Sequence, residues 1–145
     1  MYKHVLVPVD LNDGGFSDKA LEAAIWHAEH SQAKLHLINV LPGIHMSMVA
    51  TYFSKDAAAK MKQDVEKQLE SFAQKHIPQS ISYQTYVVEG KPYTSILDCA
   101  KKINADLIVM PSHKRSKLDK VMLGSVASKV VENSPINVLV IKPQG

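Results

Sequence analysis

Residues 106–129 read DLIVMPSHKRSKLDKVMLGSVASK. The segment begins with a short apolar run, Leu107–Met110, which has the composition of a strand buried on both faces. A basic loop follows Pro111, and Gly124-Ser125 then begins a predicted helix. In such a strand–loop–helix unit, backbone N–H groups and the positive end of the helix dipole face a bound anion. The segment therefore predicts an anion site at the end of a strand.

The rest of the chain continues this alternation of strands and helices. Unbroken apolar runs predict buried strands, and apolar residues spaced three and four apart predict helices with one buried face. The predicted strands cover residues 4–9, 35–40, 81–88, 107–110 and 138–141, and the predicted helices cover 17–31, 58–76, 92–103 and 125–133. Ser17 is the predicted N-cap of the first helix. Residues 43–54 show no period and are predicted to form a loop.

This order of elements predicts one doubly wound α/β domain over residues 1–145, with a five-stranded parallel sheet and helices on both faces. The usual strand order, 3-2-1-4-5, places a topological switch between strands one and four, where ligands bind outside the carboxyl ends of the strands. Asp10 follows strand one, and Pro111-Ser112-His113 follows strand four. The anion loop and the switch therefore predict the same crevice.

Charge and composition narrow the range of partners. The net charge is +3, and residues 114–120 alone carry four basic residues and one acidic residue, so the remainder is neutral. Charge this localised argues against a nucleic-acid surface. No apolar run approaches the roughly 20 residues of a membrane span. The one cysteine, Cys99, excludes an internal disulfide. Together with the lack of a signal-peptide pattern, it leads us to expect a cytoplasmic protein.

The fifth predicted strand lies at a sheet edge without the alternation or charges that protect edges. One interpretation is that helices cover both faces and that Lys142 and Pro143 guard its end. The other is that residues 138–142 pair with a second copy, which would give a homodimer or a tetramer. Trp26 falls outside the apolar stripe of the first helix and is a candidate interface residue.

The histidines show no pattern of metal or catalytic chemistry. His27 and His30 lie three residues apart on the first predicted helix, but no third ligand has suitable spacing, so we expect a surface pair and no metal site. His113 lies in the basic loop, where no serine, cysteine or acid is placed to form a nucleophile–base pair with it. We therefore expect His113 to bind or position a ligand.

Several segments resemble the universal stress protein family, in order and over essentially the whole chain. They are HVLVPVD at residues 4–10, ADLIVM at 105–110, LGSVA at 123–127 and VLVIK at 138–142. The resemblance implies a stress-response protein that holds ATP, with or without Mg²⁺, in the crevice between strands one and four.

The loop after strand four differs from the pattern of ATP-binding family members, G-x2-G-x9-G-[S/T]. The last pair falls on Gly124-Ser125, whereas Pro111 and Lys114 occupy the first two glycine positions. Proline removes a backbone donor, and Lys114 adds a side chain where a glycine lets the backbone approach phosphate. A basic residue after Ser-His resembles the F/G-like branch, and Lys114 or Arg115 could hold phosphates through its side chain.

The resemblance also implies a nucleotide site assembled from the ends of three strands and the start of the fourth helix. The end of strand one borders the nucleoside, the ends of strands two and four lie near adenine, and the helix start gives N–H groups to the phosphates. The implied residues are Pro8, Val9, Asp10, Val40, Met110, Pro111, Ser112, His113, Lys114, Arg115, Gly124, Ser125 and Val126. None of them is implied to be catalytic or a metal ligand.

Two functional interpretations remain. The first is a nucleotide-binding stress-response protein, which Gly124-Ser125 and the basic loop favour. The second is an interaction module of the same fold that acts through its dimer surface, which Pro111 and Lys114 favour. Gly124-Ser125 could also be only a helix start, Asp10 a solvated carboxylate, and residues 114–120 a solvated loop. Without a Walker lysine motif or a base to activate water, the sequence predicts at most a very slow ATPase.

Overall fold

Nine strands and helices alternate along the part of the chain that the structure describes, as the sequence predicts. The computed structural model describes residues 1–11, 16–41, 55–112 and 123–142. The strands are β1 (His4–Pro8), β2 (Lys34–Leu41), β3 (Tyr83–Glu89), β4 (Leu107–Pro111) and β5 (Asn137–Ile141), and the helices are α1 (Phe16–Ser31), α2 (Lys55–His76), α3 (Pro92–Lys102) and α4 (Ser125–Asn133). The predicted loop 43–54 and the basic run 114–120 lie outside these residues.

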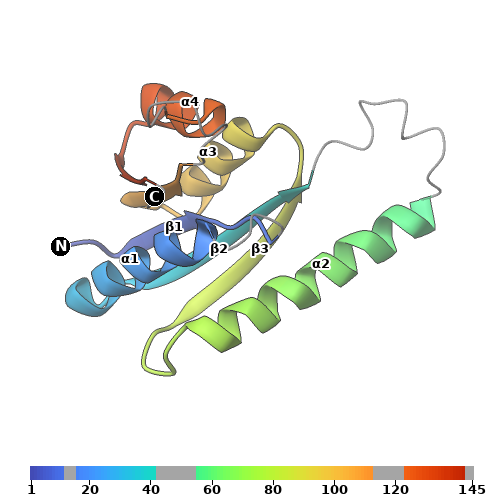
Figure 1. Cartoon of the computed structure of the whole chain (residues 1–145), viewed down its shortest axis with the longest axis horizontal. Coiled ribbons are helices and arrows are strands. Elements are labelled where there is room, and N and C mark those ends of the chain that lie inside the picture. The colour runs from blue at the N-terminus through green and yellow to red at the C-terminus, as the bar shows by residue number, and fades with distance from the viewer. Residues whose placement is uncertain (12–15, 42–54, 113–122, 143–145) are drawn as a thin grey trace.

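All five strands are parallel and lie in the order β3-β2-β1-β4-β5, which confirms the predicted doubly wound sheet (Figure 1). The central strand is β1, where Val5 pairs with Leu35 of β2 and with Leu107 of β4. The run Val5-Leu6-Val7 is fully buried. A strand covered on both faces has no wet side, which explains why its sequence does not alternate.

The helices divide the core into two layers, one on each face of the sheet (Figure 1). On one face, α1 and α2 pack on odd-numbered strand residues; the buried members include Val5, Val7, Leu35, Leu37, Ala20, Leu21, Ala24, Leu69 and Ala73. On the other face, α3 and α4 pack on even-numbered residues; the buried members include Leu6, Ile38, Ile108, Ile96, Cys99, Ala127 and Val130. This period-two division follows from the pleat of the strands.

The two edges of the sheet differ. At the β3 edge, the hydroxyl of Tyr83 donates a 2.6 Å hydrogen bond to Glu70 of α2. At the β5 edge, residues 138–141 are only half-buried, and Trp26 on neighbouring α1 is 54% exposed. Both edges are where the sequence predicts them. Pairing of β5 with a second copy stays a prediction.

The predicted helix cap at Ser17 is wrong. Helix α1 already begins at Phe16. The Ser17 hydroxyl is buried and accepts a 2.9 Å hydrogen bond from the backbone N–H of Asp10. That N–H lies just beyond the end of β1, where it has no ladder partner within the strand, so a buried hydroxyl satisfies it. Ser17 therefore braces the end of β1.

None of the helices in the described ranges has the length and apolar character needed to cross a membrane. The longest of them, α2, has 22 residues and carries charged side chains along its length.

Candidate functional site

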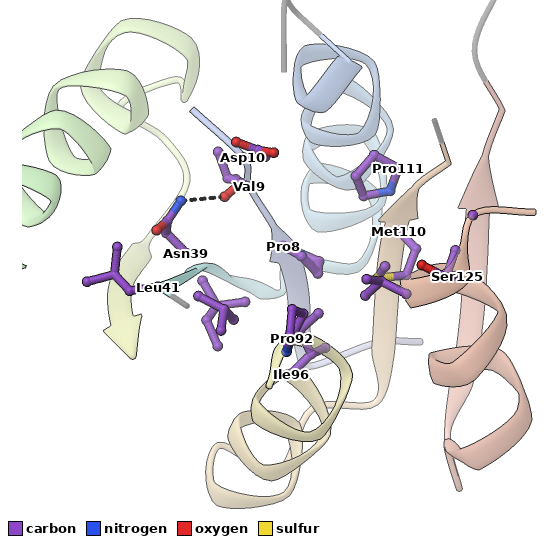
Figure 2. A pocket seen from close by; sticks show the side chains of 15 residues that line it. Pro8, Val9, Asp10, Asn39, Leu41, Pro92, Ile96, Met110, Pro111 and Ser125 are labelled. Atoms are coloured by element: carbon purple, nitrogen blue, oxygen red, sulfur yellow. Dashed lines mark hydrogen bonds between the residues drawn. The ribbon is translucent and has the colours of Figure 1, made fainter. Parts of the chain in front are cut away.

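A pocket of about 470 Å³ opens at the carboxyl ends of β1, β2 and β4, between the first turns of α3 and α4 (Figure 2). This is the topological switch, because β1 and β4 are neighbours whose connections run to opposite faces of the sheet. Its volume lies within the usual range of small-molecule sites, about 300 to 1,000 Å³.

Most of the predicted site residues meet in this pocket. The predicted residues that line this pocket in the structure are Pro8, Val9, Asp10, Val40, Met110, Pro111, Gly124, Ser125 and Val126. His113, Lys114 and Arg115 lie outside the described residues. Ser112 is buried and is not part of the lining.

Ser112 lies behind the wall of the pocket and connects three elements. Its backbone N–H donates to the carbonyl of Ile141 in β5 at 2.9 Å. Its hydroxyl accepts the backbone N–H of Gly124, before α4, at 3.4 Å. Ser112 therefore ties the end of β4 to β5 and to the start of α4. A direct role of Ser112 in binding a nucleotide stays a prediction.

The first turn of α4 presents backbone donors to the pocket. Gly124 is the N-cap, with extended backbone and no side-chain hydrogen bond to the helix. The first intrahelical bond runs from the N–H of Ser128 to the Gly124 carbonyl. The N–H groups of Ser125, Val126 and Ala127 therefore have no partner inside the helix. Such a helix start favours an anion.

The sequence alone did not identify several lining residues, which are Ile38, Asn39, Leu41, Pro92, Ile96 and Ala127. Pro92 and Ile96 were predicted as a helix start and as part of a buried stripe, and only the packing of α3 over the switch brings them to the pocket. Asn39 had a readable signal. It is a polar residue near the carboxyl end of a largely apolar strand beside the predicted crevice.

Asn39 joins the ends of two strands. Its side-chain nitrogen donates a 2.9 Å hydrogen bond to the carbonyl of Val9, and the N–H of Val9 donates to the carbonyl of Ile38 at 2.8 Å (Figure 2). Asn39 is 9% exposed. The pocket wall at β2 is therefore held by a side-chain bond as well as by the backbone ladder.

The described lining is mostly apolar. Asp10 is the one charged side chain among these residues, and it lies above the end of β1. Apart from Asn39, the wall around β2 and α3 is made of aliphatic side chains and proline, while the start of α4 supplies polar N–H groups. A flat ring with a polar tail would match both parts of this wall.

The universal stress protein family model matches residues 1–142. The chain belongs to the universal stress protein family. Universal stress protein YxiE from Bacillus subtilis is 32% identical over 152 residues, which cover 98% of this chain and all of that protein. Universal stress protein G from Salmonella typhimurium is 29% identical over 145 residues and covers the same shares. The family resemblance read from the sequence is thereby confirmed.

Solved structures of universal stress proteins share the fold. UspA from Lactobacillus plantarum superposes with a TM-score of 0.72 at 30% identity, and 97% of each chain is covered. A family member in complex with cAMP has a TM-score of 0.64 at 21% identity, with 97% of this chain and 96% of that chain covered. The Archaeoglobus fulgidus protein in complex with dAMP has a TM-score of 0.67 at 19% identity, with 97% and 98% covered. At these identities the two nucleotide complexes establish the fold.

A second polar cluster of this universal stress protein is formed by side chains of three neighbouring strands, β1, β2 and β3, and none of its residues lines the pocket. The ring of His36 contacts Nδ1 of His4 through Nε2 at 3.1 Å and the hydroxyl of Tyr86 through Nδ1 at 2.9 Å. Burial, helped by the positive charges of His4 and Lys34, lowers the pKa of His36 to about 4. His36 is therefore neutral at pH 7.

The remaining histidines and the cysteine form no further site in the part of the family fold described. The ring of His30 stacks on Trp26 at 3.9 Å between centroids, and its Nδ1 lies 2.8 Å from the Trp26 carbonyl. No group of three metal-ligating side chains occurs among the described residues. Burial raises the pKa of the Cys99 thiol, which makes it a poor nucleophile at neutral pH.

Proposed function

We propose that this protein binds an adenine nucleotide, in the cell ATP, in the pocket between β1 and β4, and that it acts as a cytoplasmic stress-response protein. One observation carries the proposal. The same pocket joins an aliphatic slot at β2 and α3 to the open N-terminus of α4. Membership of the family and the cAMP and dAMP complexes of proteins with this fold support it.

The proposed ligand lies across the carboxyl edge of the sheet. Its base packs between Val40 and Ile96, its ribose passes over β1 near Asp10, and its first phosphate meets the N–H groups at Ser125. Neighbouring strands lie about 4.8 Å apart, so the path from β2 across β1 to β4 is about 10 Å. That distance matches the length of a nucleoside monophosphate.

The further phosphates of ATP extend toward residues 113–122. In that run Lys114 and Arg115 would supply side-chain cations, in place of the glycine N–H groups of the family pattern, and Mg²⁺ bound with the nucleotide would offset part of the phosphate charge. Asp10 is the one charged side chain among the described lining residues, and in the proposed orientation it lies at the ribose rather than at the phosphates, so it is not placed to activate water there. We therefore propose that the protein binds nucleotide as a signal and hydrolyses it at most very slowly.

Thermal unfolding with and without ligand tests this function. At 100 times its Kd, a ligand adds roughly 2.7 kcal/mol, which for a chain of this size raises Tm by about 5 to 11 °C. Millimolar Mg-ATP or AMP should produce such a shift. Gly124→Val, which adds a branched side chain at the phosphate, should abolish it. Val131→Ala on the exposed face of the same helix is the matched control and should retain it. An unchanged Tm of the wild-type protein with both nucleotides would refute the proposal.

A second candidate function, an interaction module that assembles through residues 138–142, is favoured by the β5 edge. A groove of about 480 Å³ lies beside that edge, between Trp26 of α1 and Ile141-Lys142. A half-buried apolar edge strand next to an exposed tryptophan is suited to pairing with a second copy as a homodimer or tetramer. Sedimentation of Trp26→Ala should then show a weaker self-association than the wild-type protein, and a wild-type monomer at high concentration would exclude this assembly.

A further inference from the structure

Ser112 carries a buried hydroxyl group next to the pocket, although it is not part of the pocket lining. It follows Pro111, the last residue of β4, and only 2% of its surface is exposed. Its backbone N–H donates to the carbonyl of Ile141 at 2.9 Å, which extends the pairing of β4 with β5. The hydroxyl is therefore attached to the sheet.

Gly124 is the residue that this hydroxyl holds. The N–H of Gly124 donates to Oγ of Ser112 at 3.4 Å, and its carbonyl accepts the N–H of Ser128 at 2.9 Å as the first bond of α4. A glycine has no side chain that could cap the helix or restrict its own backbone. Through Gly124, the Ser112 hydroxyl therefore joins the N-cap of α4 to the end of β4.

The donors that would meet a phosphate follow Gly124 directly. The N–H groups of Ser125, Val126 and Ala127 have no acceptor inside the helix, and all three residues line the pocket. The N–H of Gly124 is already engaged by Ser112. Donors bind a ligand best when they are held in place beforehand, because ordering them on binding costs free energy. The attachment of the first turn of α4 to β4 should therefore govern how well these groups bind a phosphate.

We infer that Ser112 is a positioning residue, whose hydroxyl holds Gly124 so that the N–H groups of the next three residues face the phosphate of a bound nucleotide. The inference rests on the proposed nucleotide function. It gives Ser112 an indirect role, through Gly124, in place of direct contact with the ligand. The effect of Ser112 on binding is therefore expected only for ligands that carry a phosphate.

Binding of AMP and of adenosine to Ser112→Ala tests the inference. The two ligands share base and sugar and differ in the phosphate. Ser112→Ala should weaken AMP binding by about three- to ten-fold, the worth of one hydrogen bond, and should leave adenosine binding unchanged. The ratio of the two affinities should fall by the same factor. Unfolding curves establish that the variant is folded at the temperature of the assay.

Ser17→Ala is the matched control. Ser17 is also a buried serine whose hydroxyl accepts a backbone N–H beyond the end of a strand, but that N–H belongs to Asp10, on the nucleoside side of the proposed ligand. Ser17 itself does not line the pocket. Any loosening in this variant should weaken AMP and adenosine alike and leave the ratio of their affinities unchanged.

Amide hydrogen exchange of Gly124 in the ligand-free protein, followed by NMR, distinguishes positioning from direct contact. If Ser112 holds Gly124, Ser112→Ala should speed exchange of the Gly124 N–H by about three- to ten-fold before any ligand is added. Ser17→Ala should leave exchange at Gly124 unchanged.

The outcomes separate this inference from the proposed function. If the wild-type protein binds AMP but folded Ser112→Ala keeps or raises the ratio of AMP to adenosine affinity, the inference is overturned and the proposed function stands. A lower ratio with unchanged exchange at Gly124 also overturns it, because Ser112 would then contact the phosphate itself. If no adenine nucleotide binds to the wild-type protein, the proposed function fails first.

Discussion

His36 and Asn39 are two buried polar residues on the same strand, three positions apart, and they differ in where their hydrogen bonds go. Both ring nitrogens of His36 contact side chains of the protein, one on β1 and one on β3. Asn39 lies in the pocket lining, and its side-chain nitrogen bonds to a backbone carbonyl of β1's end, at Val9. A polar group that bonds to side chains on both sides within the sheet serves stability, whereas a polar group in the pocket lining also shapes the wall that a ligand would meet.

The largest expected effect on stability comes from removing the side chain of His36. His36→Ala leaves a cavity and takes partners away from His4 and Tyr86, so it should lower the free energy of unfolding by about 2 to 4 kcal/mol. Denaturant unfolding at pH 7.5 measures this loss. AMP affinity should not change, because none of these three side chains lines the pocket. A large loss of affinity in folded His36→Ala would contradict the division between the two residues.

The pH dependence of stability sharpens the same comparison. The pKa of His36 is about 4 in the folded protein and 6.5 for the free side chain. Between these values the unfolded state binds more protons, so stability is fully present above pH 6.5 and falls as the pH is lowered towards 4. Allowing for solvent screening, the loss between pH 7.5 and 4.5 should be roughly 1 to 2 kcal/mol. His36→Ala should lack this component, and an identical pH profile in the variant would refute the assignment.

The smallest expected effect on stability comes from Asn39, in the pocket lining. Asn39→Ala removes one hydrogen bond, to a carbonyl at the pocket rim where water can replace the amide. Its free energy of unfolding should fall by only about 1 kcal/mol. Denaturant unfolding of Asn39→Ala beside His36→Ala measures the difference directly. Equal losses in the two variants would show that Asn39 is as fully committed to the fold as His36.

The sequence predicted those parts of the fold that depend on local pattern. The unbroken apolar runs of β1 and β4 require burial on both faces, and this led to the parallel sheet and its switch. The bounds of α4 were predicted without error, because Gly124 and the apolar spacing after it mark a helix start. The pocket at the carboxyl ends followed from topology.

Contacts between residues distant in sequence could not be predicted. His36 meets Tyr86 across 50 positions, and Asn39 meets Val9 across 30. Neither contact produces a recognisable pattern in the sequence around its residues. Ser17 shows the opposite problem, since a serine before an apolar stripe is the usual sign of a helix cap. Its hydroxyl instead bonds to the backbone beyond β1, because a tertiary contact overrides the local preference.

Ser112 links the β5 edge of the sheet to the start of α4. One peptide N–H reaches the β5 edge at Ile141, and one hydroxyl reaches the helix start at Gly124. If a phosphate displaced Gly124, as the proposed function would allow, Ser112 would connect that displacement to the edge strand. If a ligand changes the affinity between two copies by some factor, self-association must change the affinity for that ligand by the same factor, because the two binding equilibria are linked. Ser112 is the residue through which ligand binding and self-association would be coupled, with one coupling free energy for both.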